Sequence, residues 1–226
     1  MLERVIAVIG PPAAGKTALT VQLAEQSGCQ VFRLREHVPD TILAVTASSA
    51  ERLGWIDDLT VARALRAYIG TVMFDGTAHT VLLDNFPGSS IQVGLLFGTL
   101  RRLAPACVVH PVELVADRAV REQRVRDRRV CHQCEHDPIH DPRLPALANP
   151  SHPHHCARCG GVLHPRRGDA PRLLAARKRR YEAEAIGIRA AFADADAELV
   201  RLESSRPIAA LAADLSPLFA TRSTSP

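Results

Sequence analysis

The sequence GPPAAGKT, residues 10–17, follows the aliphatic run RVIAVI and precedes a helical pattern. It fits G-x-x-x-x-G-K-[ST], a motif that requires a strand before it and a helix after it. In such a loop the backbone N–H groups bind phosphate, the lysine reaches the outer phosphates and the final hydroxyl binds Mg²⁺. The alternative is a chance match at a helix start. We expect a phosphate-binding loop made by Gly10, Pro11, Pro12, Ala13, Ala14, Gly15, Lys16 and Thr17.

Short aliphatic segments alternate with helical patterns along the chain. Strands are expected at 4–9, 80–84 and 107–114, with weaker ones at 29–34 and 198–202. Helices are expected at 16–26, 57–74, 91–103, 116–129, 171–193 and 207–218. The alternation predicts an α/β fold of the P-loop NTPase type, with three α/β/α layers and a five-stranded parallel sheet.

The composition is that of an ordinary soluble protein, with 46% hydrophobic and 23% charged residues in a chain of 226. The net charge of +4 is mild and concentrated at 118–129 and 166–180, which suits a compact polyanion better than nucleic acid. The apolar run near the N-terminus is too short to cross a bilayer and has no cleavage site behind it. We expect a cytoplasmic protein with no membrane partner.

Two C-x2-C pairs interrupt this pattern within a segment rich in His and Pro, residues 131–168. Four thiolates from two such turns are typical of a structural zinc site, and a metal would stabilise a segment too poor in apolar residues to fold alone. We expect Zn²⁺ to bind Cys131, Cys134, Cys156 and Cys159. Alternative ligands are His132, His136, His140, His152, His154 and His155.

Asp84 ends the aliphatic run TVLLD and precedes a loop. A carboxylate at this place in a phosphate-binding protein can hold Mg²⁺ through water, so we expect Mg²⁺ at Thr17 and Asp84. An aspartate that begins an ordinary turn is the alternative.

Four arginines form the remaining group of candidate site residues. Arg124 and Arg128 are four residues apart on one helical face, and Arg166 and Arg177 follow the cysteine segment. Guanidinium groups suit phosphate oxygens, and phosphoryl transfer needs several of them. The alternative is a set of solvated helix faces.

Taken in order, these elements resemble the adenylate kinases and related nucleoside monophosphate kinases, specifically the bacterial type with a zinc-binding lid. The resemblance rests on GPPAAGKT, LGWIDDLTV, LLDNFPGSSIQ, RVRDRRVCHQC, CARCGGVLHPRRGD, RKRRY and VRLESSRPIAAL. It implies an enzyme that transfers phosphate from ATP to a nucleoside monophosphate or similar small acceptor, and we expect a monomer. It divides the chain into a kinase core (1–30, 75–128 and 169–220), an acceptor region (31–74), a lid (129–168) and a disordered tail (221–226).

The resemblance also implies residue roles. Lys16, Arg128, Arg166 and Arg177 would bind the transferring phosphate, and Arg124 and Arg206 would lie near the adenine of ATP. The acceptor would contact Gly54, Asn85, Phe86 and Gln92, with Gln92 reading the base.

The chain departs from the family where the acceptor phosphate is bound, because Gly88 and Val38 stand in place of two arginines. We hypothesise that Arg33 or Arg35 replaces the lost cation; the alternative is that they pair with Glu36 or Asp40.

The acceptor therefore need not be AMP. Other interpretations are a P-loop kinase acting on a different small molecule, and a zinc-containing, nucleotide-switched nucleic-acid-binding module. The last is disfavoured because the cysteine segment lacks aromatic residues for stacking and the whole chain is 4% aromatic.

Overall fold

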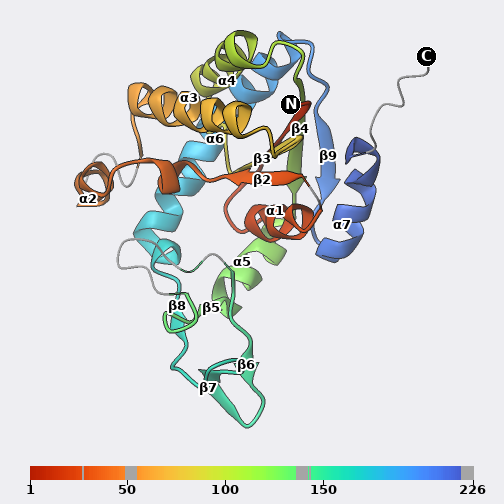
Figure 1. The fold of residues 1–226 in the computed structure, drawn as a ribbon. Coiled ribbons are helices and arrows are strands. Elements are labelled where there is room, and N and C mark those ends of the chain that lie inside the picture. The colour runs from red at the N-terminus through yellow and green to blue at the C-terminus, as the bar shows by residue number, and fades with distance from the viewer. Residues whose placement is uncertain (27, 49–54, 136–141, 143, 220–226) are drawn as a thin grey trace.

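A computed structural model describes residues 1–26, 28–48, 55–135, 142 and 144–219. Among these, five parallel strands form the central sheet in the order β2-β3-β1-β4-β9 (Figure 1). The strands are β1 (Arg4–Ile9), β2 (Cys29–Phe32), β3 (Thr80–Asp84), β4 (Val108–Val115) and β9 (Val200–Glu203). Each lies at a predicted position, so the predicted five-stranded parallel sheet is confirmed.

Six helices also match predicted segments: α1 (Lys16–Ala24), α3 (Asp58–Asp75), α4 (Ser90–Leu103), α5 (Arg118–Asp127), α6 (Pro171–Ala193) and α7 (Ile208–Leu215). One further helix, α2 (Asp40–Ser48), was not predicted. Its sequence DTILAVTAS is short and rich in β-branched residues, which favour helices weakly, so no helical pattern stands out. Short 3-10 helices occupy η1 (Leu34–His37), η2 (Arg167–Asp169) and η3 (Ser216–Phe219).

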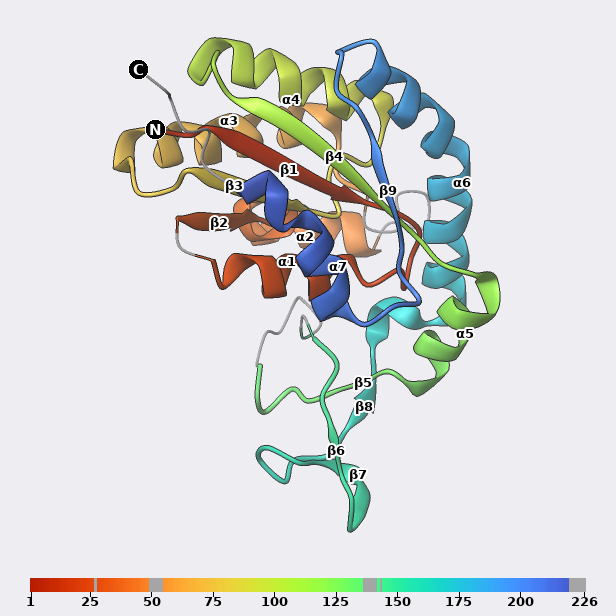
Figure 2. The ribbon, with the colours of Figure 1, turned by 90° about the vertical axis from the view of Figure 1, so that its right-hand side faces the viewer.

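The helices cover both faces of the sheet because successive side chains of β1 point to opposite sides. Val5, Ala7 and Ile9 belong to the same apolar core as α3, α4 and α6. Ile6 and Val8 pack instead with α1 and α7. Figure 2 shows α7 in front of the sheet, with α3, α4 and α6 behind and beside it.

This arrangement creates a topological switch point at the carboxyl ends of β1 and β3. The two strands are neighbours, yet the helix after β1 covers one face and the helix after β3 covers the other. Their following loops therefore leave in opposite directions, and open α/β sheets bind ligands in the crevice outside such a point. The loop at 10–17 and the loop after Asp84 both border it.

The cysteine-containing segment between α5 and α6 projects away from the sheet (Figures 1 and 2). Its stem pairs β5 (Arg129–Val130) with β8 (His164–Pro165), and farther out β6 (Ala148–Asn149) pairs with β7 (His152–Cys156). The predicted division into core, acceptor region and lid stays a prediction. The tail at 221–226 lies outside the described residues, as does Gly54.

No helix in the described part of the chain combines the length and the apolar character needed to cross a membrane.

Glu113 joins α6 and β9 to strand β4 of the sheet. It lies on β4 and is 1% exposed. Its carboxylate accepts hydrogen bonds of 2.6 Å from the Tyr181 hydroxyl and of 2.6 and 3.1 Å from Arg189, and forms an ion pair of 3.2 Å with Arg201. Burial raises the pKa of Glu113, but the hydrogen bonds from Arg189 and Tyr181 outweigh it, so the net pKa lies below its ordinary value.

Glu113→Gln is expected to lower the free energy of unfolding by about 1–3 kcal/mol, because charged hydrogen bonds to buried groups are lost. Since the folded pKa is depressed, this stabilisation is present above the ordinary carboxyl pKa and disappears as the pH falls through the folded value. Urea unfolding at neutral and acidic pH measures both effects. Glu182→Gln, on the exposed face of α6, is the control, and equal losses in the two variants would contradict the assignment.

Candidate functional site

The loop from Gly10 to Thr17 is tightly folded between β1 and α1. Gly10, Ala13 and Gly15 have φ angles of 141°, 65° and 98°. A Cβ on Gly10 would lie 2.6 Å from the carbonyl oxygen of Leu114, so only glycine fits there. The predicted strand, loop and helix context of the motif is confirmed.

The side chain of Lys16 folds back over this loop. Its Nζ donates hydrogen bonds of 2.7 Å to the Gly10 carbonyl and 2.8 Å to the Pro11 carbonyl. Lys16 is 7% exposed. Burial, followed by the positive charge of Arg177, lowers its pKa to about 7, and Asp84 opposes this shift.

Lys16 is the centre of a cationic cluster, which we define as Lys16, Arg128, Arg166 and Arg177. Arg128 and Arg166 also lower the pKa of Lys16. Burial, followed by Arg166, lowers the pKa of Arg177 to about 10. Four predicted residues separated by up to 161 positions therefore lie close enough to repel one another.

Asp169 holds part of this cluster, although it is not among the predicted site residues. Its carboxylate accepts hydrogen bonds from Arg128 Nε at 2.8 Å and Arg128 Nη2 at 2.5 Å. Arg177 Nη1 lies 4.0 Å from Asp169 and donates to the Gly168 carbonyl at 3.0 Å. The sequence could have indicated this role, because Asp169 is the only acidic residue between Arg166 and Arg180.

Asp84 is buried beside the same loop and faces two donors. Thr17 Oγ1 donates to Asp84 Oδ1 at 3.2 Å, and Arg33 Nε donates to Asp84 Oδ2 at 3.2 Å. A hydroxyl and a carboxylate this close are the hard oxygen ligands that Mg²⁺ prefers. Arg33 also lies 3.9 Å from Glu36, so the hypothesised acceptor cation interacts with carboxylates in this state.

Arg124 and Arg206 occupy different positions relative to the cluster. Arg124 donates to the carbonyls of Ala13 and Ala14 at 3.4 and 3.3 Å and to the Ser204 carbonyl at 2.5 Å. It thereby ties the loop to the end of β9. Arg206 forms an exposed ion pair of 2.6 Å with Asp214. Their predicted contacts with adenine stay predictions.

The predicted acceptor residues border the loop after β3. Gln92 Oε1 accepts from the Gly88 N–H at 2.8 Å, and Gln92 Nε2 donates to Asp58 at 3.4 Å. Phe86 is buried against Phe32, with ring centroids 5.6 Å apart, whereas Asn85 is exposed. Gln92 therefore fixes the loop and the start of α3 in this structure.

Arg35 lies in η1, after β2. Burial lowers its pKa, and its charge contributes to the lowered pKa of Arg177. The structure thus brings Arg35 toward the cationic cluster.

Trp55 and Arg180 also border the loop after β3, and sequence reasoning did not single them out. A Cβ on Gly88 would lie 3.1 Å from Trp55 Cη2, and the Arg180 guanidinium carbon lies 4.5 Å from the Trp55 ring centroid. The signal that could have drawn attention is that Trp55 is the single tryptophan of the chain.

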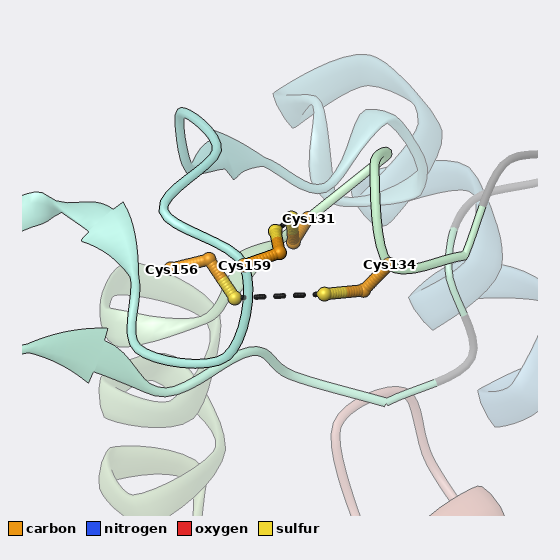
Figure 3. A group of neighbouring side chains, drawn as sticks. All are labelled: Cys131, Cys134, Cys156 and Cys159. Atoms are coloured by element: carbon orange, nitrogen blue, oxygen red, sulfur yellow. Dashed lines mark hydrogen bonds between the residues drawn. The ribbon is translucent and has the colours of Figure 1, made fainter.

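The four predicted cysteine ligands lie together (Figure 3). All four sulfur atoms are within 4.8 Å of one another, with Cys131 and Cys159 at 3.4 Å and Cys134 and Cys156 at 3.7 Å. A tetrahedral zinc site with Zn–S bonds of about 2.3 Å needs sulfurs roughly 3.8 Å apart. The cluster could therefore hold a metal ion such as zinc.

Histidine does not join this metal-ligand cluster within the described residues. His132, His152, His154 and His155 are described, and His136 and His140 lie outside the described residues.

The sequence matches no protein-family model and no curated protein sequence. A function therefore has to be inferred from the geometry of the site.

The purified protein is expected to carry about one zinc ion per chain, because four thiolates complete a closed tetrahedral site. Cys156→Ser should lose most of this zinc, and residues 131–168 should become more sensitive to limited proteolysis. Metal analysis and proteolysis of the same samples measure this. Cys107→Ser, outside the cluster, is the control; equal zinc in the wild type and Cys156→Ser would contradict the prediction.

Proposed function

We propose that this chain transfers a phosphoryl group from ATP to a nucleoside monophosphate. The observation that carries the proposal is the cationic cluster, placed at the switch point of the sheet beside the Thr17–Asp84 pair. Phosphoryl transfer is catalysed mainly by positioning and by neutralising negative charge, and it needs no protein group to form a covalent bond. Lys16 and three guanidinium groups meet that need.

The electrostatics of the cluster support an anionic ligand. Burial lowers the pKa values of Lys16 and Arg177, and repulsion from the neighbouring guanidinium groups lowers them further. Polyphosphate between these groups would offset the repulsion and replace the carbonyl contacts of Lys16 with stronger charged hydrogen bonds. The N–H groups of the loop and the start of α1 would bind the same phosphates.

Mg²⁺ fits the oxygen atoms present at this site. Thr17 would bind the ion directly and Asp84 would bind it through water, after Asp84 releases Arg33. The bound ion would supply additional neutralisation of the phosphate charge. The chain's own part is to orient the phosphates with Lys16 and the arginines.

The projecting segment is proposed to act as a zinc-stabilised lid. Arg128 precedes it, Arg166 follows its stem, and the Arg128–Asp169 ion pair joins its two ends. Movement of the segment would therefore change the positions of the phosphate-binding arginines. Closure over the crevice would exclude water and favour transfer over hydrolysis.

The acceptor is proposed to be a nucleoside monophosphate that need not be AMP. Val38 is 5% exposed and belongs to the apolar core, so this position contributes packing and no charge. Arg33 and Arg35 are proposed to remain the cations on the acceptor side of the site. A different small phosphorylated molecule is the second candidate for the acceptor.

Transfer of labelled phosphate from ATP to a panel of ribo- and deoxynucleoside monophosphates tests the proposal. Lys16→Met is expected to reduce kcat by roughly 10²–10³-fold, because a charged stabilising group is lost. Lys178→Met, at the only other lysine, should leave kcat within about twofold. If no monophosphate accepts the label, the proposed function is wrong.

ATP binding is expected to take up a proton at pH 8. Lys16, with a pKa of about 7, is mostly neutral there, and bound phosphates would raise its pKa and favour the charged form. ATP affinity should therefore fall as the pH rises above 7.

Calorimetry in buffers of different ionisation enthalpy measures the uptake. Lys16→Arg should bind ATP without taking up a proton, because its guanidinium group is already protonated at this pH. Equal proton uptake in the variant and the wild type would contradict the assignment to Lys16.

A further inference from the structure

Trp55, Gly88 and Arg180 form a continuous stack beside the loop after β3. The edge of the indole would lie 3.1 and 3.3 Å from a Cβ on Gly88, closer than ordinary packing, so the absence of a side chain at Gly88 makes room for the ring. Arg180 lies over the indole at 4.5 Å from its centroid, which is cation–π distance. The indole therefore contacts the loop through its edge and the guanidinium through its face.

The main chain around this stack is held by its neighbours. The Gly88 N–H is bound by Gln92, which also reaches Asp58 three residues after Trp55. Tyr181, next to Arg180, is bound to Glu113 in the sheet. Both sides of the stack are therefore fixed independently, which is the arrangement expected of a ligand subsite.

Helix α6 connects this stack to the cationic cluster. Arg177 and Arg180 are three residues apart on it, so they lie on one face. Arg177 contributes to the cluster around Lys16, whereas Arg180 lies one turn farther along the helix, at the loop after β3. A molecule that receives phosphate at Arg177 would extend toward Arg180.

We propose that Arg180, positioned by Trp55 on Gly88, binds the phosphate of the acceptor. This inference rests on the proposed function and identifies the acceptor as a phosphate monoester, whose dianion suits a guanidinium fork. Trp55 acts as a positioning residue, since the indole packs against the guanidinium at cation–π distance and restricts where it can lie.

Tryptophan fluorescence gives a direct test, because Trp55 is the only tryptophan in the chain. Titration of the full chain with AMP, CMP, GMP, UMP, dTMP and inorganic phosphate, with ATP titrated separately, should change the emission for at least one monophosphate. Arg180→Ala should raise the Kd of that monophosphate about 10- to 100-fold and leave the Kd of ATP within about twofold. The monophosphate Kd of Arg180→Lys should fall between those of the wild type and Arg180→Ala.

Arg179→Ala is the matched control, since it removes the same charge from the exposed side of the same helix. Trp55→Phe, followed by calorimetry, should weaken the monophosphate less than Arg180→Ala. If Arg180→Ala and Arg179→Ala have equal acceptor Kd and KM values, the subsite assignment is wrong, while phosphoryl transfer by both variants would leave the proposed function standing.

A monophosphate that binds with the predicted Arg180 dependence but receives no phosphate from ATP would confirm the subsite and overturn the proposed function. No fluorescence response and no transfer with any of these compounds would overturn both.

Discussion

The buried ammonium group of Lys16 is the constraint on which the rest of the site depends. It is held by the carbonyls of its own loop, and burial, followed by three guanidinium groups, makes its charge unfavourable. Burying a cation is costly unless opposite charge compensates it. The tight turn at Gly10, the opposite directions of the connections after β1 and β3, and the arginines on either side of the projecting segment all position groups around Lys16.

Two carboxylates fix the elements that carry the arginines of the cluster. Asp169 holds Arg128 and lies near Arg177, joining the beginning and the end of the projecting segment. Glu113 holds Tyr181 and Arg189, which fixes the middle of α6 to the sheet. Asp169 therefore links the cluster to the proposed moving part, and Glu113 links the same helix to the rigid part. The proposed closure over the substrates requires both properties.

Much of the fold could be predicted because its local signals agree. The buried runs of β1 and β3, the motif between β1 and α1, and the two C-x2-C pairs each carry a pattern that sequence alone defines. Helix α2 carried no such pattern, because its β-branched residues have weak helix propensity and depend on packing.

The site was predictable where a residue belonged to a motif or, as for Arg128, Arg166 and Arg177, to the arginine pattern and the family resemblance. Lys16, Thr17, Asp84 and the four cysteines did, and the structure brings them into the expected groups. Trp55, Gly88 and Arg180 meet only through tertiary packing between α6 and the loop after β3. Their sequence separations have no period that could have indicated contact.

A crystal structure with ATP and Mg²⁺ would test the central claim most directly. We predict that Lys16 leaves the carbonyls of Gly10 and Pro11 to contact the outer phosphates, that Arg177 contacts the same phosphates, and that Asp84 exchanges Arg33 for the hydrated ion. ATP bound elsewhere, or bound in the crevice with the Lys16–carbonyl contacts and the Arg33–Asp84 ion pair intact, would contradict it.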